Sequence, residues 1–341
     1  MSFVVKIEPS NLSFNVEADE SILAAALRQH IAMPYGCRSG TCGNCKGHVL
    51  SGEITYPIKE ALVLTPEELD SNVALFCQAR ALSDLTIEAH LLPTLNDIVV
   101  KKLPCRVTEK AQLSHDVIGV KLKLPVTESF QFVGGQYIDI LLADGRRRSF
   151  SLANAPQDNH FVELHIRVIE GGDFTHFVMD ELQEKAILRI EGPHGNFFLR
   201  EDSDLPVIFM AGGTGFAPVK SIIEQSIASG ITREMHLYWG ARTHQDLYLH
   251  DLALQWAQDY PHIQYIPVLS EPDDDTAANL RTGWVHEAIL QDFNDLSDYE
   301  IYACGPPAMV MAGKTRFPSH RLSLENYFSD AFEFQEPKKP G

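Results

Sequence analysis

Apolar and polar residues alternate at the start of the chain. The alternation runs through residues 3–7 and again through residues 12–16, with Pro9-Ser10-Asn11 between the two segments. A period of two is typical of strands that bury one face, so the pattern predicts a β-hairpin. Apolar residues at helical spacing follow over residues 22–31, and we predict a helix there that ends before Pro34.

The middle of the chain carries short apolar segments that are separated by turn residues. These segments cover residues 105–109, 117–124, 137–142, 148–152 and 162–169. Short strands at such spacing are typical of an antiparallel barrel or sandwich. One stretch with a helical pattern, residues 175–182, interrupts the series.

After Leu205 the pattern changes to strand-like runs that alternate with helical ones. The strand-like runs cover residues 207–211, 234–239, 263–269 and 300–303, and the helical ones cover residues 218–228 and 250–258. This alternation predicts an α/β domain with a parallel sheet. We therefore predict three domains, at residues 1–93, 100–202 and 203–334, and a frayed polar tail at 335–341.

Composition supports several domains and excludes some classes of protein. A chain of 341 residues is too long for one ordinary core. Its mean hydropathy is -0.10, and no apolar run is long enough to cross a bilayer, so we expect no membrane span. The net charge of -18 would repel nucleic-acid phosphates and favours a partner protein with basic patches.

The cysteines are clustered. Cys37, Cys42 and Cys45 form a C-x4-C-x2-C loop, and Cys77 is the fourth candidate. Because the start of the sequence has no pattern of a secretory signal, we expect a cytoplasmic protein in which such a cluster binds metal. We expect the loop glycines at 36, 40 and 43 to adopt positive φ and to point N–H groups at inorganic sulfur.

This spacing is typical of a plant-type [2Fe-2S] cluster that is held by four thiolates. A structural zinc site is the alternative, although zinc sites usually have two separated C-x2-C pairs. Together with its predicted hairpins and helix, the segment 1–93 resembles a plant-type ferredoxin. That resemblance implies a β-grasp (α+β) fold.

Two features of the second domain suit a diphosphate. Arg146-Arg147-Arg148 is a run of cations on an acidic chain. A guanidinium group can bind two phosphate oxygens at once, in a bidentate arrangement. A solvated turn is the alternative for this run. Gly171 and Gly172 then open the predicted helix, whose N-terminus would suit an anion.

At this point the chain resembles the ferredoxin-NADP reductase family, which binds FAD on an antiparallel β-barrel. The resemblance implies that Arg148 holds the pyrophosphate, Phe150 lies against the flavin ring and Ser151 acts at the flavin as a catalytic residue. It also implies that His165, Ile166 and Arg167 line the ribityl and phosphate side of the flavin, and that Gly172 and Thr175 belong to a loop that holds its pyrophosphate. Phe150 replaces the tyrosine that is usual in the family, so the phenolic hydrogen bond is lost.

Three turns follow strands of the third domain. They contain Gly212, Gly213, Thr214 and Gly215, then Arg242, and then Cys304, Gly305 and Pro306. Ligands of open α/β sheets bind at the carboxyl ends of the strands, and glycines allow a dinucleotide to approach the backbone. A simple turn between strand and helix is the alternative for the first of these.

These turns also resemble the nicotinamide domain of the same family. The resemblance implies that Thr214 touches both cofactors, that Cys304 is a catalytic residue beside the nicotinamide and that Phe332 covers the flavin. Ordinary core packing is the alternative for Phe332. Arg242 has no second cation beside it and is followed by Asp246, so we favour NADH over NADPH.

The order ferredoxin, flavin barrel, nicotinamide domain resembles the reductase components of bacterial oxygenases and of a deoxysugar dehydratase. It implies an oxidoreductase that passes electrons from NADH through FAD and the cluster to such a partner. Two alternatives stay open. One is an electron-transfer subunit that does not oxidise NADH itself, and the other is a zinc-bearing interaction module.

Overall fold

The computed structural model describes residues 2–57, 63–92, 95, 98–158, 160–272 and 280–332. The chain divides into two compact units, Met1–Val99 and Val100–Gly341. The predicted frayed tail lies outside the described residues. No helix in the described part of the chain combines the length and apolar character that a membrane crossing requires.

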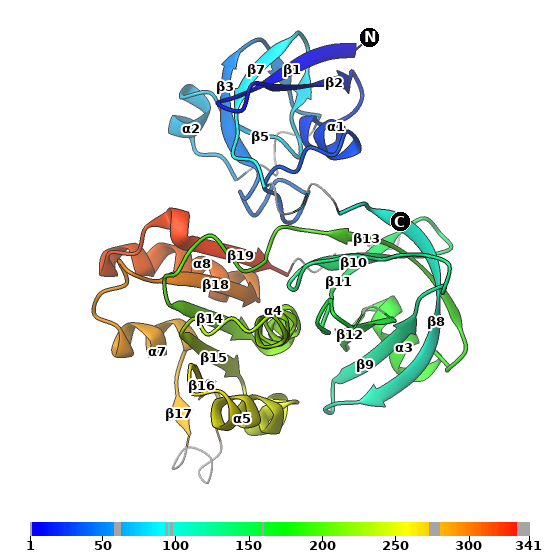
Figure 1. Ribbon diagram of the computed structural model, residues 1–341, viewed down its shortest axis with the longest axis vertical. Coiled ribbons are helices and arrows are strands. Elements are labelled where there is room, and N and C mark those ends of the chain that lie inside the picture. The colour runs from blue at the N-terminus through cyan, green and yellow to red at the C-terminus, as the bar shows by residue number, and fades with distance from the viewer. Residues whose placement is uncertain are drawn as a thin grey trace. The chain divides into compact units, whose positions relative to one another are not determined.

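The first unit is a mixed sheet with one main helix against it (Figure 1). The sheet order is β2-β1-β7-β3-β5, with β1 and β2 antiparallel and β1 and β7 parallel. The bounds are β1 Ser2–Glu8, β2 Leu12–Glu17, α1 Ile22–Arg28, β3 Lys46–Ser51, β4 Ile54–Thr55, α2 Pro66–Asp70, β5 Val73–Leu75, β6 Arg80–Ala81 and β7 Leu85–Glu88.

Helix α1 covers this sheet through Ile22 and Leu23, and Ser21 caps its first turn by accepting from the Ala24 N–H at 3.2 Å. The helix is shorter than the predicted 22–31. His30 has a φ of +59°, and the chain therefore turns out of the helix before the last apolar residue of the stripe.

The second unit begins with a six-stranded antiparallel barrel (Figure 1). Its order is β11-β10-β13-β8-β9-β12, and a bridge from Leu152 to Leu164 joins the two ends. The bounds are β8 Lys101–Gln112, β9 Val117–Lys123, β10 Tyr137–Leu141, β11 Arg147–Ser151, β12 Phe161–Arg167, α3 Asp173–Asp180 and β13 Ile187–His194. Strand β13 was not predicted, because Ile187 is exposed and Gly192-Pro193 resembles a turn.

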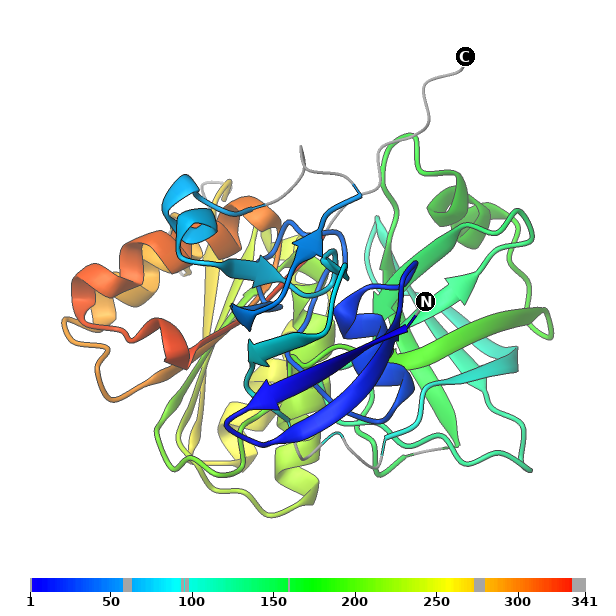
Figure 2. The same ribbon diagram turned by 90° about the horizontal axis from the view of Figure 1, so that it is seen from above.

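A parallel sheet of order β17-β16-β15-β14-β18-β19 completes this unit. Its elements are β14 Val207–Gly212, α4 Phe216–Ala228, β15 Met235–Ala241, α5 His250–Asp259, β16 Ile263–Leu269, β17 Arg281–Thr282, α7 Val285–Asp292, β18 Glu300–Gly305, α8 Pro307–Arg316 and β19 Tyr327–Ala331. Helices α4 and α5 bury one face and α7 and α8 the other (Figure 2). All six residues of β14 are buried, which explains its unbroken apolar run.

Candidate functional site

The cysteine loop lies between α1 and β3, and Cys77 follows β5. Backbone N–H groups point at its sulfur atoms. The Cys37 N–H donates to Cys42 Sγ and the Cys42 N–H to Cys37 Sγ, both at 3.4 Å, and the Ser39 N–H also donates to Cys37 Sγ at 3.4 Å. Thiolates that accept several N–H groups are stabilised as anions, which is the state that binds metal.

Two of the three loop glycines have the predicted positive φ, Gly40 at +90° and Gly43 at +78°. The prediction is wrong for Gly36, which is not among the glycines with positive φ. A glycine fits at position 36 because a side chain would be crowded there. A Cβ would lie 3.3 Å from Cys42 Sγ and 3.0 Å from the Asn44 side chain. Arg38 takes the remaining left-handed position, at +59°.

The four sulfur atoms are arranged in two pairs. The hydrogen bond with Cys42 lowers the pKa of the Cys37 thiol to about 3, and the bond with Cys45 lowers the pKa of Cys77. The same bonds raise the pKa values of Cys42 and Cys45. The thiols therefore interact as two pairs, Cys37 with Cys42 and Cys45 with Cys77.

This pairing fits a two-iron cluster, in which each iron takes two thiolates. A single tetrahedral zinc ion would need all four sulfurs within about 4 Å of one another. Among the described residues, the sets of three or more ligand atoms that lie within 4.8 Å of one another contain no cysteine. The donor set therefore suits [2Fe-2S] better than zinc.

The predicted flavin residues Arg148, Phe150 and Ser151 lie on β11. Arg148 and Phe150 are half-buried and Ser151 is buried. The Phe150 ring lies 5.7 Å from the ring of Phe174, in the first turn of α3. This contact brings the strand to the predicted anion site at the start of the helix.

The start of α3 is shaped by its own side chains. Gly172 is the N-cap, and a Cβ there would lie 2.6 Å from Thr175 Oγ1. Thr175 donates to the Gly172 carbonyl at 3.0 Å and accepts from the Ile169 N–H at 3.2 Å. The Thr175 hydroxyl thus holds the glycine loop in place.

Carboxylates of the protein itself pair with part of the arginine run 146–148. Arg146 is paired with Asp144 and Asp173, and Arg147 pairs with Glu191. Carboxylates of the chain thus neutralise two of the three guanidinium groups. The run as a whole is therefore not evidence for a diphosphate, and the assignment of Arg148 rests on the family resemblance and on its place beside Phe150 on β11.

Strand β12 positions the other predicted flavin residues. Ile166 is buried, and both ring nitrogens of the buried His165 have partners, Glu163 at 2.9 Å and the Tyr248 hydroxyl at 3.1 Å. Both nitrogens of the His165 ring are therefore bonded to protein groups. A flavin could contact this residue only through its backbone. Arg167 donates to Asp116 at 2.7 Å.

The glycine turns after β14 and β18 pack backbone against backbone. A Cβ on Gly215 would lie 2.1 Å from the Cys304 carbonyl oxygen, and one on Gly305 would lie 2.6 Å from the Gly212 carbonyl oxygen. Gly212 also has no room for a Cβ, because Pro306 Cδ would be 2.8 Å away. These glycines therefore allow the two turns to meet at one edge of the sheet.

Other predicted nicotinamide residues surround this junction. Gly213 has a φ of +53°, and Thr214 beside it is half-buried. Cys304 is fully buried, and burial raises the pKa of its thiol, which is therefore neutral. The N–H of Phe332 donates to the Gly305 carbonyl at 2.9 Å, so the C-terminal aromatic segment lies along the same turn.

Arg242 and Arg167 meet at one carboxylate. Asp246 Oδ1 is 3.6 Å from Arg242 Nη2 and 3.5 Å from Arg167 Nη2. Burial would raise the pKa of Asp246, but hydrogen bonds from the Thr243 backbone and side chain, and the positive charges of the two arginines, lower it. Asp246 therefore stays charged between a residue predicted to bind flavin and one predicted to bind the nicotinamide nucleotide. The sequence predicted no such link between Arg242 and Arg167.

Comparison with known proteins gives three matches to family models. Residues 5–82 match a 2Fe-2S iron-sulfur cluster binding domain, 104–199 an oxidoreductase FAD-binding domain and 209–314 an oxidoreductase NAD-binding domain. Each match lies inside one of the three domains predicted from the sequence.

Relatives match along nearly the whole length. The CDP-6-deoxy-L-threo-D-glycero-4-hexulose-3-dehydrase reductase of Yersinia pestis is 42% identical over 332 residues, which cover 97% of this chain and 99% of that protein. The phenol hydroxylase P5 protein of Acinetobacter pittii is 37% identical, over 97% of this chain and 95% of the relative. The chain belongs to the family of iron-sulfur flavoprotein reductases.

A solved structure of the same family supports the fold. The Amycolatopsis cytochrome P450 reductase GcoB superposes on the reductase with a TM-score of 0.81 and 33% identity, covering 97% of this chain and 98% of that one. The predicted architecture of ferredoxin, flavin barrel and parallel-sheet nicotinamide domain is thereby confirmed. The reductase is an oxidoreductase that passes electrons from NAD(P)H through FAD and a [2Fe-2S] cluster to a partner protein.

Proposed function

We propose that this reductase oxidises NADH and delivers single electrons from its cysteine loop to a CDP-6-deoxyhexulose 3-dehydrase. The observation that carries this proposal is the 42% identity to a reductase of such a dehydrase along the full length of both chains. A reductase component of an oxygenase is the second candidate, because the phenol hydroxylase P5 protein is 37% identical over a similar length.

Different residues of the chain hold the three redox groups in this proposal. When bound, FAD accepts two electrons as hydride and gives them up singly, and the cluster carries one electron at a low potential. In this proposal Arg148 and the start of α3 hold the diphosphate of FAD, and Ser151 lies at its ring. The turns of Gly215 and Gly305 receive the nicotinamide, and Cys37, Cys42, Cys45 and Cys77 hold the cluster.

Cys304 and Phe332 would shape the nicotinamide pocket without supplying charge. The Cys304 thiol is buried and neutral, so it offers shape and a weak hydrogen bond rather than an anion. Phe332 is tied to Gly305 through its backbone, and its ring is only half-buried. Both residues would exclude water from the reacting atoms.

A preference for NADH rests on the carboxylate of Asp246. A 2′-phosphate on the ribose would gain from Arg242, but Asp246 lies 3.6 Å from the same guanidinium and stays ionised. Its negative charge would oppose the phosphate of NADPH and leave the uncharged ribose of NADH unaffected. The kcat/KM values for the two nucleotides test this, and equal values would contradict it.

We place the reductase in the reducing cytoplasm, since none of its six cysteines forms a disulfide and four of them are assigned to the cluster. The central experiment is an anaerobic titration of the purified protein with NADH. Flavin and cluster absorbance should both decrease, and a cluster that stays oxidised would refute the proposed order of electron flow. No reaction with NADH at all would favour the non-catalytic electron-transfer subunit.

The partner is tested by reconstitution. Purified dehydrase with its CDP-sugar should make the reductase consume NADH, and the oxygenase component of a phenol hydroxylase should not. Stimulation by the oxygenase alone would favour the second candidate. Stimulation by neither would overturn both assignments of the partner.

A further inference from the structure

Helix α4 connects the nicotinamide turn to the flavin barrel. It begins directly after Gly213–Gly215, and its polar face contacts loops of the barrel. The Ser221 hydroxyl donates to the Asn154 carbonyl at 2.6 Å, and Gln225 Oε1 accepts from the Gly134 N–H at 2.6 Å. Asn154 lies three residues beyond Ser151, at the end of the predicted flavin strand.

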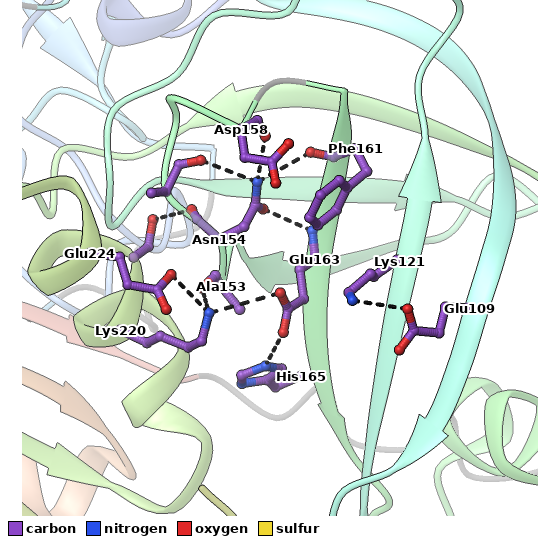
Figure 3. A network of polar contacts seen from close by, with 12 residues as sticks. Glu109, Lys121, Ala153, Asn154, Asp158, Phe161, Glu163, His165, Lys220 and Glu224 are labelled. Atoms are coloured by element: carbon purple, nitrogen blue, oxygen red, sulfur yellow. Dashed lines mark hydrogen bonds and ion pairs between the residues drawn. The ribbon is translucent and has the colours of Figure 1, made fainter. Parts of the chain in front are cut away.

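A buried lysine makes a further contact between this helix and the barrel (Figure 3). Lys220 is only 7% exposed, and its Nζ donates to the Ala153 carbonyl at 2.9 Å and to Glu224 at 2.9 Å. It also lies 3.8 Å from Glu163 Oε2, on barrel strand β12. Lys220 therefore has two hydrogen-bond acceptors and a second carboxylate at ion-pair distance, and Ala153 and Glu163 among these three partners belong to the barrel.

From Glu163 the contacts return to the nicotinamide turn. Glu163 bonds to His165, and His165 bonds to the Tyr248 hydroxyl. The Tyr248 ring meets Trp239 edge to face at 5.2 Å, and Trp239 Nε1 donates to the Gly213 carbonyl at 3.0 Å. A continuous chain of buried and half-buried residues thus joins the segment after β11 to the turn that follows β14.

This series of contacts contains charged groups that are paired with one another. Burial would raise the pKa of Glu163, but the bond to His165 and the charge of Lys220 lower it to about 2. A buried ion pair costs desolvation, and an apolar contact of the same size would often be more stabilising. A gain in folding stability is therefore a weak explanation for the presence of these charged groups. A role in fixing the geometry between helix and barrel explains them better.

We infer that Lys220 and Glu163 are positioning residues, which fix the nicotinamide turn relative to the flavin-binding strand for hydride transfer. The inference rests on the proposed function. Hydride transfer requires reacting atoms about 3–3.5 Å apart, and here the two binding segments belong to different domains. The ion pair, with Ser221, is what ties the two segments to one rigid helix.

The test compares Lys220→Met, Glu163→Gln and the double variant with the wild type in stopped-flow reduction by NADH. We expect FAD content, cluster content and reduction by dithionite to be unchanged in all of them. The limiting rate of flavin reduction should fall by about 100-fold, the typical cost of a misplacement of about 1 Å. The long-wavelength absorbance of stacked nicotinamide and flavin should weaken in parallel, and Lys220→Arg should restore part of both.

A matched control is Lys110→Met. Lys110 also donates to backbone carbonyls, those of Met179 and Leu182 at 2.8 and 3.1 Å, but within the barrel. We expect it to keep the wild-type rate. A comparable loss in this control would show a general effect of removing a lysine that donates to backbone carbonyls and would overturn the inference.

Two further outcomes decide the inference. If Lys220→Met leaves two carboxylates without a cation and does not fold, the double variant, which loses both members of the pair, is the deciding protein. A double variant with the wild-type limiting rate and absorbance would overturn the positioning role. Failure of the proposed function looks different, because the wild type itself would then not be reduced by NADH.

Discussion

The cysteine loop and the nucleotide-binding region are built in opposite ways. Three of the four proposed sulfur ligands lie within nine consecutive residues, 37–45, and backbone N–H groups of the same loop surround them. The nucleotide region takes its parts from β11, β12, α3, β14 and β18, and its contacts join residues as far apart as Ala153 and Lys220. A local motif can thus specify a metal centre, whereas a site for two nucleotides depends on how domains pack.

The largest expected effect breaks the first region and spares the second. In Cys42→Ser one of four ligands is lost, and we expect no [2Fe-2S] cluster and no NADH-dependent reduction of cytochrome c. Reduction of ferricyanide by the flavin should persist, because the second unit keeps its contacts. Iron and sulfide assays with both acceptors measure this, and equal loss of both activities would contradict the division. Cys105→Ser, at a buried position without ligand neighbours, should keep the cluster.

The converse change breaks the second region and spares the first. In Gly215→Ala the new Cβ would lie 2.1 Å from the Cys304 carbonyl oxygen, so the two glycine turns must move apart. We expect NADH-dependent flavin reduction to fall about 100-fold while the cluster remains. Gly230→Ala is the control, because its φ of +70° costs about 1 kcal/mol but no atom lies within 4 Å of the added methyl. A normal rate in Gly215→Ala would refute the close packing of the turns.

The same contrast explains what could be predicted from the sequence. The spacing of Cys37, Cys42 and Cys45 indicated the cluster, and the fully apolar run before Gly212 indicated a central parallel strand. Both signals are local. Strand β13 gave no such signal, since a strand that is exposed at Ile187 and contains Gly192-Pro193 does not alternate regularly.

Tertiary partners could not be predicted for a related reason. Lys220 is the only cation on helix α4, and its partners Ala153 and Glu163 are set by the packing of barrel and sheet. Asp116 lies in a short loop between two strands and has no motif around it, although it pairs with Arg167. The arginine run misled in the other direction, because carboxylates distant in sequence neutralise part of it.

A smaller effect tests which arginine of the run 146–148 binds FAD. Arg148→Ala should weaken FAD binding by about 30-fold, since a charged hydrogen bond contributes about 2 kcal/mol. Arg146→Ala is the control, because Arg146 already pairs with Asp144 and Asp173, and its loss should change FAD affinity little. Titration of the apoprotein with FAD gives both constants. Similar losses in the two variants would mean that general charge, and not Arg148, attracts the diphosphate.

The smallest expected effect concerns the choice of nucleotide. Asp246→Asn removes a negative charge beside Arg242 and keeps an oxygen that can accept from the Thr243 N–H, which now donates to Asp246 at 2.9 Å. The ratio of kcat/KM for NADH to that for NADPH should fall by about fivefold, which corresponds to about 1 kcal/mol. Asp251→Asn, an exposed acid in the first turn of α5, should leave the ratio unchanged. A ratio that stays constant in Asp246→Asn would assign the preference to other residues, and the pairing of Arg242 would then serve only to link it with Arg167.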